Sequence, residues 1–227
     1  MTKGQKTKEL LLEAAKEEFR ELGFQNASVG SIAKRLGVQP SLFSYHYKNI
    51  PTVIRIINQN FHKEIWDLLH RQDIPDPMIF LFAYDLIVDI ITYSTPQSRR
   101  FKYESSKSNR LSMYAMDTAL RDPIGIEDSY YDAILHYYQK AMSHETLYRL
   151  RMQESAGRRE MFITYCEKDQ YQKISEDDWY NLCVNISYCT ITTVFRFAGI
   201  SNELVDKKFN EAFELIGKLD LSHICLL

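Results

Sequence analysis

The chain has 227 residues, which allows one or two domains with a substantial core. Glycine and proline are scarce, at 8 and 6 residues, and 45% of the residues are hydrophobic, so long helices are favoured over a turn-rich β fold. The formal net charge of -2 excludes a uniformly basic protein that coats nucleic acid.

Positive charge is concentrated near the N-terminus. Residues 1–66 contain ten Lys or Arg and six Glu residues, a net charge of +4. Residues 67–227 contain 18 positive and 24 negative residues, a net charge of -6. A basic head on an acidic body suits a phosphate-binding module joined to a second unit, although uneven surface charge alone gives the same pattern.

No targeting signal or membrane span is expected. The N-terminal run MTKGQKTKEL is polar and lacks the apolar core of a signal peptide, and charges interrupt the longest apolar stretches. The four cysteines form no CxxC pair, so they are expected to stay reduced in a cytoplasmic protein that makes no membrane contact.

The first helix is expected over residues 7–22, with its apolar residues on one face. Gly23 is expected to end this helix, and Phe24 to fold back onto the core. The apolar face consists of Leu11, Ala14, Ala15, Phe19 and Leu22.

Residues 28–48 predict two short helices joined by a tight turn. Ser28 is placed to cap the first helix, Gly37 to end it, and Pro40 to start the second helix, which ends at Lys48. This pattern fits a helix–turn–helix whose second helix enters the DNA major groove. It also fits a plain helical hairpin inside a bundle.

A fourth helix is expected from Pro51 to about Leu69, with a single apolar stripe. The two prolines of residues 71–77 then forbid a continuous helix and mark the clearest break in the chain. The sequence therefore divides into a head of residues 1–69 and a body of residues 70–227. The stripe consists of Ile54, Ile57, Phe61, Ile65 and Leu68.

The body is expected to be helical throughout. The helix over residues 78–94 is apolar on most faces and should be a central, buried element. Residues 184–195 are rich in β-branched residues typical of strands, but helical spacing and the absence of turn residues favour a helix. The other expected helices are two within 97–120, broken around 105–109, then 130–142, 145–167, 176–198 and 202–219, with a turn at 122–125.

Tyrosines are abundant in the body, and a buried tyrosine needs a partner for its hydroxyl group. The body is therefore a candidate site for a small hydrophobic or aromatic ligand, although such aromatic stripes are more often ordinary core. The candidate ligand-binding residues are Phe82, Leu86, Tyr103, Tyr114, Tyr138, Met152 and Phe162.

No metal, cofactor or catalytic motif is found. The histidines lack ligand spacing, the cysteines are scattered, and a mixed site assembled in space stays open. There is no glycine-rich phosphate loop, GxSxG motif or nucleophile–base pair, so the chain is not expected to be an enzyme.

The last two helices, over 176–199 and 202–219, carry apolar residues on more than one face. A face left over after the core is packed is a candidate homodimer surface, and complete burial within one monomer is the alternative.

The segment from Gly37 to Asn49 carries a family resemblance. Gly37-Val38-Gln39-Pro40, Phe43, Tyr45-His46-Tyr47 and Lys48-Asn49 resemble the signature of tetracycline-repressor-type (TetR/AcrR) regulators, as do the upstream runs LLEAAKEEFRELGF and SVGSIAKRLGV. The resemblance implies an all-α fold in which an N-terminal three-helix helix-turn-helix head is joined by a long helix to a helical ligand-binding and dimerisation domain. It implies a homodimeric repressor that a small molecule releases from a palindromic DNA operator.

The expected base-contacting residues are Gln39, Ser41, Leu42 and Ser44, because they fall on the side opposite Phe43 and Tyr47. The expected phosphate contacts are Lys3, Lys6, Ser28, Tyr45, His46 and Lys48, with Pro40 at the start of the helix; capping or packing is the alternative for His46.

Four residues depart from the family pattern: Ser41, Leu42, Ser44 and Ile50. Leu42 can only pack on a thymine methyl group, and Ile50 removes a charge that often touches phosphate. These departures keep open a small-molecule-binding or enzymatic helical protein whose head has lost DNA specificity.

Overall fold

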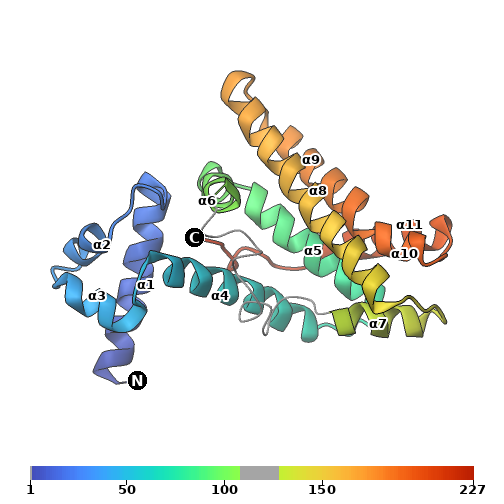
Figure 1. Cartoon of the computed structure of the whole chain (residues 1–227), viewed down its shortest axis with the longest axis horizontal. Coiled ribbons are helices and arrows are strands. Elements are labelled where there is room, and N and C mark those ends of the chain that lie inside the picture. Colours follow the sequence, from blue (N-terminus) through green and yellow to red (C-terminus); the bar gives the residue numbers. More distant parts are fainter. Residues whose placement is uncertain (1, 108–127) are drawn as a thin grey trace.

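The computed structural model describes residues 2–107 and 128–227, and within these ranges every regular element is an α-helix. The all-α prediction is confirmed. A small head, a long connecting helix and a larger helical body follow one another along the longest axis of the molecule (Figure 1). The helices are α1 (Lys3–Leu22), α2 (Val29–Arg35), α3 (Pro40–Tyr47), α4 (Ile50–His70), α5 (Pro77–Tyr93), α6 (Pro96–Lys107), α7 (Asp128–Tyr137), α8 (His144–Tyr171), α9 (Glu176–Ile191), α10 (Thr193–Phe197) and α11 (Asn202–Ile216).

The head consists of α1, α2 and α3 packed at the start of α4. Helix α1 begins at Lys3, earlier than predicted, because Thr2 and Gln5 form a capping box that extends the helix towards the N-terminus. Its predicted end is confirmed: Gly23 adopts φ 78°, and the buried Phe24 packs against Phe19 at 6.3 Å between ring centroids.

Gly23 lies where no other residue fits well. Its φ is in the region that favours glycine, and a Cβ atom there would overlap the carboxylate of Glu104 from α6. Gly157 is the matched control, because it lies inside α8 with open space around an added Cβ.

We expect Gly23→Ala to lower the free energy of unfolding by about 1–3 kcal/mol, because it adds backbone strain and displaces Glu104. Gly157→Ala should instead raise it by about 0.5–1 kcal/mol, because alanine loses less entropy in a helix. Urea unfolding of both variants checks this pair, and equal shifts would contradict the assignment.

Helix α4 leads from the head into the body (Figure 1). The predicted stripe of Ile54, Ile57, Phe61, Ile65 and Leu68 is buried. The break after α4 is also as predicted, and α5 starts at Pro77 with the Asp76 side chain accepting from the Met78 N–H group at 2.9 Å.

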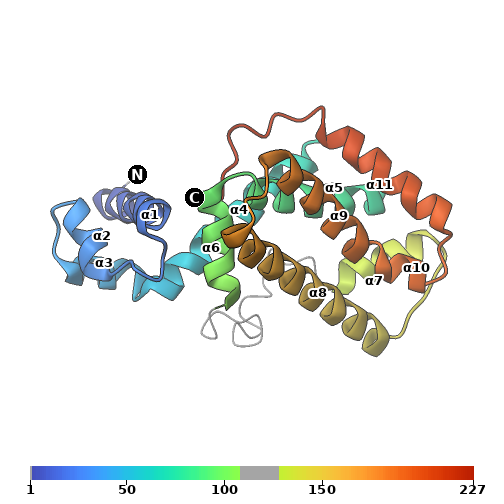
Figure 2. The ribbon, with the colours of Figure 1, turned by 90° about the horizontal axis from the view of Figure 1, so that it is seen from above.

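Helix α5 is the central helix of the body, with most of its side chains buried. It packs against α11 and α9, its two most extensive contacts, and α8 lies beyond α9 (Figure 2). The prediction of a buried central helix is confirmed. Among the described residues no single helix is long and apolar enough to cross a membrane, and α5 and α6 pass such a test only as a pair bent by 106°.

Several predicted boundaries in the body were wrong. Helix α7 ends at Tyr137, before Met142, because Gln139 adopts φ 56° and the Lys140 N–H group donates to the Leu135 carbonyl at 2.8 Å, which closes the helix. Helix α8 extends further at both ends than 145–167, and α11 ends at Ile216 rather than Leu219. Of the two helices expected within 97–120, the structure describes α6; the rest, with the turn at 122–125, lies outside the described residues.

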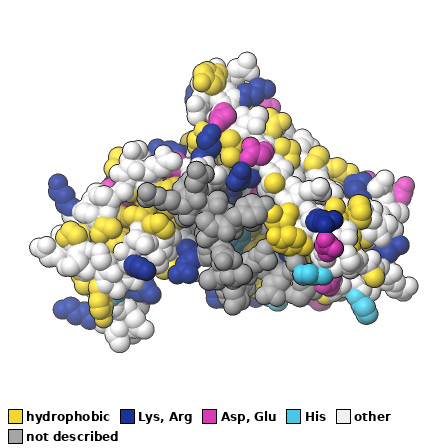
Figure 3. Space-filling view, in the orientation of Figure 1, with side chains coloured by type: hydrophobic (Ala, Val, Ile, Leu, Met, Phe, Trp, Pro, Cys, Tyr) yellow, Lys and Arg dark blue, Asp and Glu magenta, His cyan; other side chains and the backbone are white. Residues whose placement is uncertain are grey.

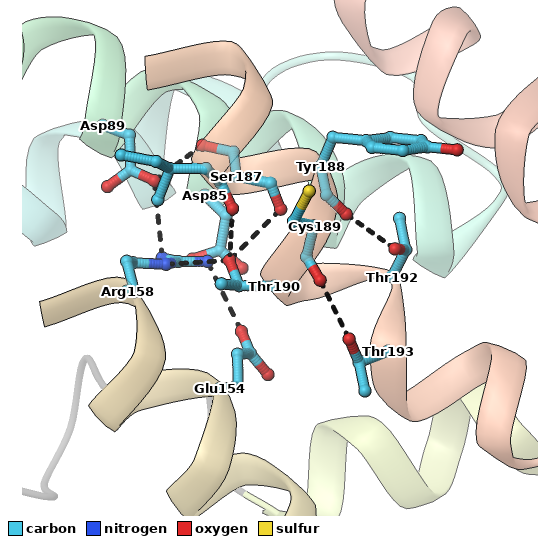
Figure 4. Close-up of polar contacts among 11 residues, drawn as sticks. Asp85, Asp89, Glu154, Arg158, Ser187, Tyr188, Cys189, Thr190, Thr192 and Thr193 are labelled. Carbon is cyan, nitrogen blue, oxygen red and sulfur yellow. Dashed lines mark hydrogen bonds and ion pairs between the residues drawn. The ribbon is translucent and has the colours of Figure 1, made fainter. Parts of the chain in front are cut away.

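The predicted helix 176–198 is interrupted at Thr192, between α9 and α10. Three threonine hydroxyl groups donate to carbonyl oxygens one turn earlier: Thr190 to Ile186 at 2.8 Å, Thr192 to Tyr188 at 2.6 Å and Thr193 to Cys189 at 2.9 Å (Figure 4). Such bonds compete with the backbone ladder and bend helices. The β-branched run is nevertheless helical, as predicted.

Candidate DNA-binding face and ligand-binding domain

The turn between α2 and α3 is fixed by backbone geometry. Gly37 adopts φ 64°, which lets the Val38 N–H group donate to the Ala33 carbonyl at 3.0 Å. Ser28 caps α2 as predicted, accepting from the Ser31 N–H group at 2.9 Å, and Pro40 occupies the first turn of α3. The predicted helix–turn–helix is therefore present.

Two aromatic residues attach α3 to the head. Phe43 and Tyr47 are buried with their rings 5.7 Å apart, and the Tyr47 hydroxyl group donates to the Lys8 carbonyl of α1 at 2.6 Å. Burial raises the pKa of Tyr47 to about 12, so the hydroxyl keeps the proton that it donates. The orientation of α3 is therefore determined by the core of the head.

The opposite side of α3 faces solvent, as the sequence predicted. Tyr45 is 83% exposed and stands beside the half-buried His46, with 5.0 Å between the ring centroids. Leu42 is half-buried, and the hydroxyl of Ser28 is engaged in its cap. The exposed residues of the predicted DNA-binding set are Lys3, Lys6, Ser28, Gln39, Pro40, Ser41, Ser44, Tyr45 and Lys48. Contact of these residues with DNA stays a prediction.

In the view of Figure 3, Lys and Arg side chains are scattered over the head with few Asp or Glu side chains among them. Lys48 follows α3 with φ 63°, an uncommon backbone conformation for lysine. Asn49 then caps α4 by accepting from the Thr52 N–H group at 3.0 Å.

Helix α6 of the body contacts the head directly, and no sequence pattern predicts this contact. Arg100 donates from one guanidinium nitrogen to the carbonyl oxygens of Phe19 at 3.1 Å and Arg20 at 2.6 Å, at the C-terminal end of α1. Glu104 accepts from the Gln25 N–H group at 3.2 Å. The head is therefore held by α6 as well as by α4.

Helix α4 is connected to the central helix by a side-chain pair. His62 Nδ1 lies 2.7 Å from the Tyr84 hydroxyl oxygen of α5. Burial lowers the pKa of His62 to about 4, with a smaller effect from the Lys102 charge, so the imidazole stays neutral at physiological pH.

The predicted ligand-binding residues do not gather around one cavity in the described part of the chain. Phe82 packs between Phe195 and Phe209 in the main core, where Leu86 is also buried. Phe162 belongs to a second cluster, stacked on Tyr93 at 4.7 Å.

The remaining candidates have separate partners. The Tyr138 hydroxyl donates to Asp76 at 2.5 Å, and the Tyr103 hydroxyl donates to Glu167 at 3.2 Å. Met152 is half-buried on α8, and Tyr114 lies outside the described residues. A ligand-binding role for this set stays a prediction.

A polar cluster lies instead where α5, α8 and α9 meet (Figure 4). The Arg158 guanidinium lies 3.1 Å from Asp85, 3.7 Å from Asp89 and 3.4 Å from Glu154. We call these four residues the Arg158 cluster. On α9, Ser187 donates to Asp89 at 2.6 Å and Thr190 accepts from Arg158 at 3.3 Å. This cluster was not predicted from the sequence. The pattern that could have indicated it is the pair Asp85 and Asp89, two acidic residues one helical turn apart in an otherwise apolar helix.

Burial raises the pKa of Glu154 to about 7, although Arg158 acts in the opposite direction. Because an unfolded glutamate titrates near pH 4.3, the folded protein binds the extra proton between about pH 4.5 and 7. Stability therefore falls as pH rises through this window, and the loss is complete above it.

We expect Glu154→Gln to be more stable than the parent protein at about pH 8, by on the order of 2 kcal/mol, and equally stable near pH 4.5. Thermal unfolding across pH measures the difference. Glu160→Gln, an exposed position on the same helix, is the control and should show no such pH dependence. A constant difference at both pH values would contradict the raised pKa.

Residues 11–50 match the family model described as "Bacterial regulatory proteins, tetR family". No curated protein matches the chain in sequence.

Three solved structures share the fold. TylP, a TetR regulator from Streptomyces fradiae, is 13% identical with a TM-score of 0.56, covering 93% of this chain and 99% of that one. Thermus thermophilus FadR, a TetR-family transcriptional repressor in complex with lauroyl-CoA, is 16% identical with a TM-score of 0.53, covering 79% and 90%. NalD, the secondary repressor of the MexAB-OprM multidrug efflux pump in Pseudomonas aeruginosa, is 15% identical with a TM-score of 0.50, covering 80% and 94%.

Proposed function

We propose that this chain, whose residues 11–50 match the model of the TetR family of bacterial regulatory proteins, is a member of that family and a ligand-responsive DNA-binding repressor rather than an enzyme. The observation that carries the proposal is α3, a helix attached by buried Phe43 and Tyr47 whose other side presents Gln39, Ser41 and Tyr45 to solvent. A helix presented in this way can enter a major groove. Such a regulator would act in the cytoplasm, where its operator lies.

The proposed DNA contacts fall into two groups. Gln39, Ser41 and Ser44 would form hydrogen bonds with base edges, and Leu42 would pack on a thymine methyl group. Lys3, Lys6, Ser28, Tyr45, His46 and Lys48 would bind phosphates and position α3.

A homodimer through α9 and α11 would present two copies of α3 to one palindromic operator, with half-sites about 34–36 Å apart. Aromatic side chains exposed on these helices support this surface. Tyr180 of α9 is 45% exposed, Phe213 of α11 is 37% exposed, and their ring centroids lie 6.5 Å apart. Val184 of α9 is only half-buried in one chain.

We expect the double variant Tyr180→Asp, Phe213→Asp to raise the dimer dissociation constant at least about tenfold, because two carboxylates would be buried in an apolar interface. Sedimentation equilibrium measures it. Tyr137→Asp, at a 55% exposed tyrosine of α7, is the control and should leave association unchanged. A double variant that dimerises like the parent protein would place the interface elsewhere.

The response to ligand requires two conformers with different spacing of the heads. A ligand in the body would favour one conformer through its differential affinity for the two. Two routes lead from the body to the head: α4, through the His62–Tyr84 pair, and α6, through Arg100 and Glu104 at the end of α1.

The test of the proposed function is operator binding by the full chain. Fluorescence anisotropy at physiological salt should show at least about 1,000-fold tighter binding to DNA from the upstream region of its own gene than to random DNA of equal length. Equal affinities would reject the repressor proposal.

A further inference from the structure

The Arg158 cluster holds more negative than positive charge in direct contact. Three carboxylates, from Asp85, Asp89 and Glu154, share the guanidinium of Arg158 (Figure 4). The positive charges of Arg151 and Lys102 also act on the carboxylates of Glu154 and Asp89, respectively. Buried charges are stable only when they are paired and hydrogen-bonded, so the cluster has capacity for a further cation.

One oxygen of the cluster has no hydrogen-bond partner among the described residues. The Glu154 side chain is only 9% exposed, and its Oε1 atom faces Arg158. Its Oε2 atom is buried and forms no hydrogen bond with any described residue. Because buried polar atoms are nearly always bonded, this oxygen points to a donor that is supplied by another molecule.

The cluster is not sealed from solvent. Arg158 keeps 19% of its side-chain surface exposed to solvent and Asp85 keeps 14%, although three helices surround them. Among the described residues, no group of three or more His, Cys, Asp or Glu side chains is placed to hold a metal ion, so the cluster does not suit one. An organic cation does not need that geometry.

One aromatic residue of the body is affected by the charges of two of the carboxylates. Tyr131 of α7 is buried and stacked on Phe195 at 5.7 Å. Burial raises its pKa, and the charges of Glu154 and Asp85 raise it further. The ring already attracts one cation, the Arg151 guanidinium, whose centre lies 4.5 Å from the ring centroid. Carboxylates beside an aromatic ring suit an ammonium group.

We propose that the Arg158 cluster binds an organic cation, a protonated amine on an apolar body, with Glu154 Oε2 accepting its hydrogen bond. The apolar body would pack among the surrounding core side chains of α5 and α7. The role of this cation as the effector rests on the proposed repressor function, whereas its binding does not.

Isothermal titration calorimetry of the full chain at about pH 8 tests the proposal, with three probes that share one phenylbutyl group: phenylbutylamine, phenylbutanol and phenylbutyrate. At this pH the amine is protonated and Glu154 is ionised. We expect the amine to bind at least about tenfold more tightly than the alcohol and the acid. Glu154→Gln should remove this preference, and Glu160→Gln should retain it.

Binding of the acid as tightly as the amine, no binding of the amine, or an unchanged preference in Glu154→Gln would each overturn the proposal. Its failure is distinguishable from that of the repressor function, because calorimetry uses no DNA. A protein that binds operator DNA but not the amine refutes the cation site alone. A protein that binds the amine but no operator refutes the repressor function alone.

Discussion

Replacing Tyr45 and Lys48 with alanine is expected to lower the affinity for operator DNA at least about 100-fold. Each side chain is exposed beside α3, and each would donate a charge-assisted hydrogen bond to a phosphate, an interaction of about 1.5–3 kcal/mol. A dimer loses both contacts at two half-sites. The fold should not change, because Phe43 and Tyr47, which attach α3, are untouched.

The matched control for this experiment is the double variant Lys168→Ala, Tyr171→Ala at the end of α8. Both residues are exposed, and Tyr171 is 87% exposed, so the control removes the same side-chain types far from the head. Anisotropy measurements on all three proteins give the comparison. Equal affinities of the two double variants would mean that α3 does not bind the operator.

Arg158→Met is expected to lower the free energy of unfolding by about 3–5 kcal/mol near pH 8, because it leaves buried carboxylates without their cation. Asp85 and Asp89 of α5 and Glu154 of α8 would then repel one another with little compensation. Part of the loss should be recovered in acid, where these carboxylates are protonated.

Arg149→Met on the same helix is the control for Arg158→Met. Arg149 is 72% exposed and pairs with the exposed Glu145, and such surface pairs contribute less than about 1 kcal/mol. Urea unfolding measures both variants. A loss below about 1 kcal/mol for Arg158→Met would show that the cluster does not connect α5, α8 and α9.

The head could be predicted from the sequence because its signals are local. Ser28, Gly37 and Pro40 each determine a cap or turn through their own chemistry, and the structure confirms all three. The exposed side of α3 followed from helical spacing opposite Phe43 and Tyr47. No partner distant in sequence was needed for these predictions.

The body could be predicted as helices but not as a site. Arg158 and Asp85 are 73 positions apart, so hydropathy along the chain could not reveal that they pair. Most of the predicted ligand-binding residues are aromatic, and of these Phe82 and Phe162 lie in two different clusters of the core. The interruption at Thr192 was missed because helical spacing does not reveal hydroxyl bonds to the preceding turn.

The contact between α6 and the head was likewise absent from the sequence signals. Arg100 lies in a polar helix that is typical of a solvated surface, yet its guanidinium donates to the last turn of α1. The sequence pointed to α4 as the connection between the domains, and the structure adds α6. The domain boundary at residue 69 stays a prediction.

The most direct test of whether a dimer of this chain recognises DNA through α3 is a selection experiment. The full chain selects DNA fragments from a random pool, and the selected fragments are sequenced. We predict enrichment of a palindromic sequence whose half-site centres lie about one helical turn apart, or a multiple of it. Thymines should be enriched where Leu42 of α3 meets the bases. A pool that stays random, or that converges on a single motif without a symmetric partner, would contradict the account.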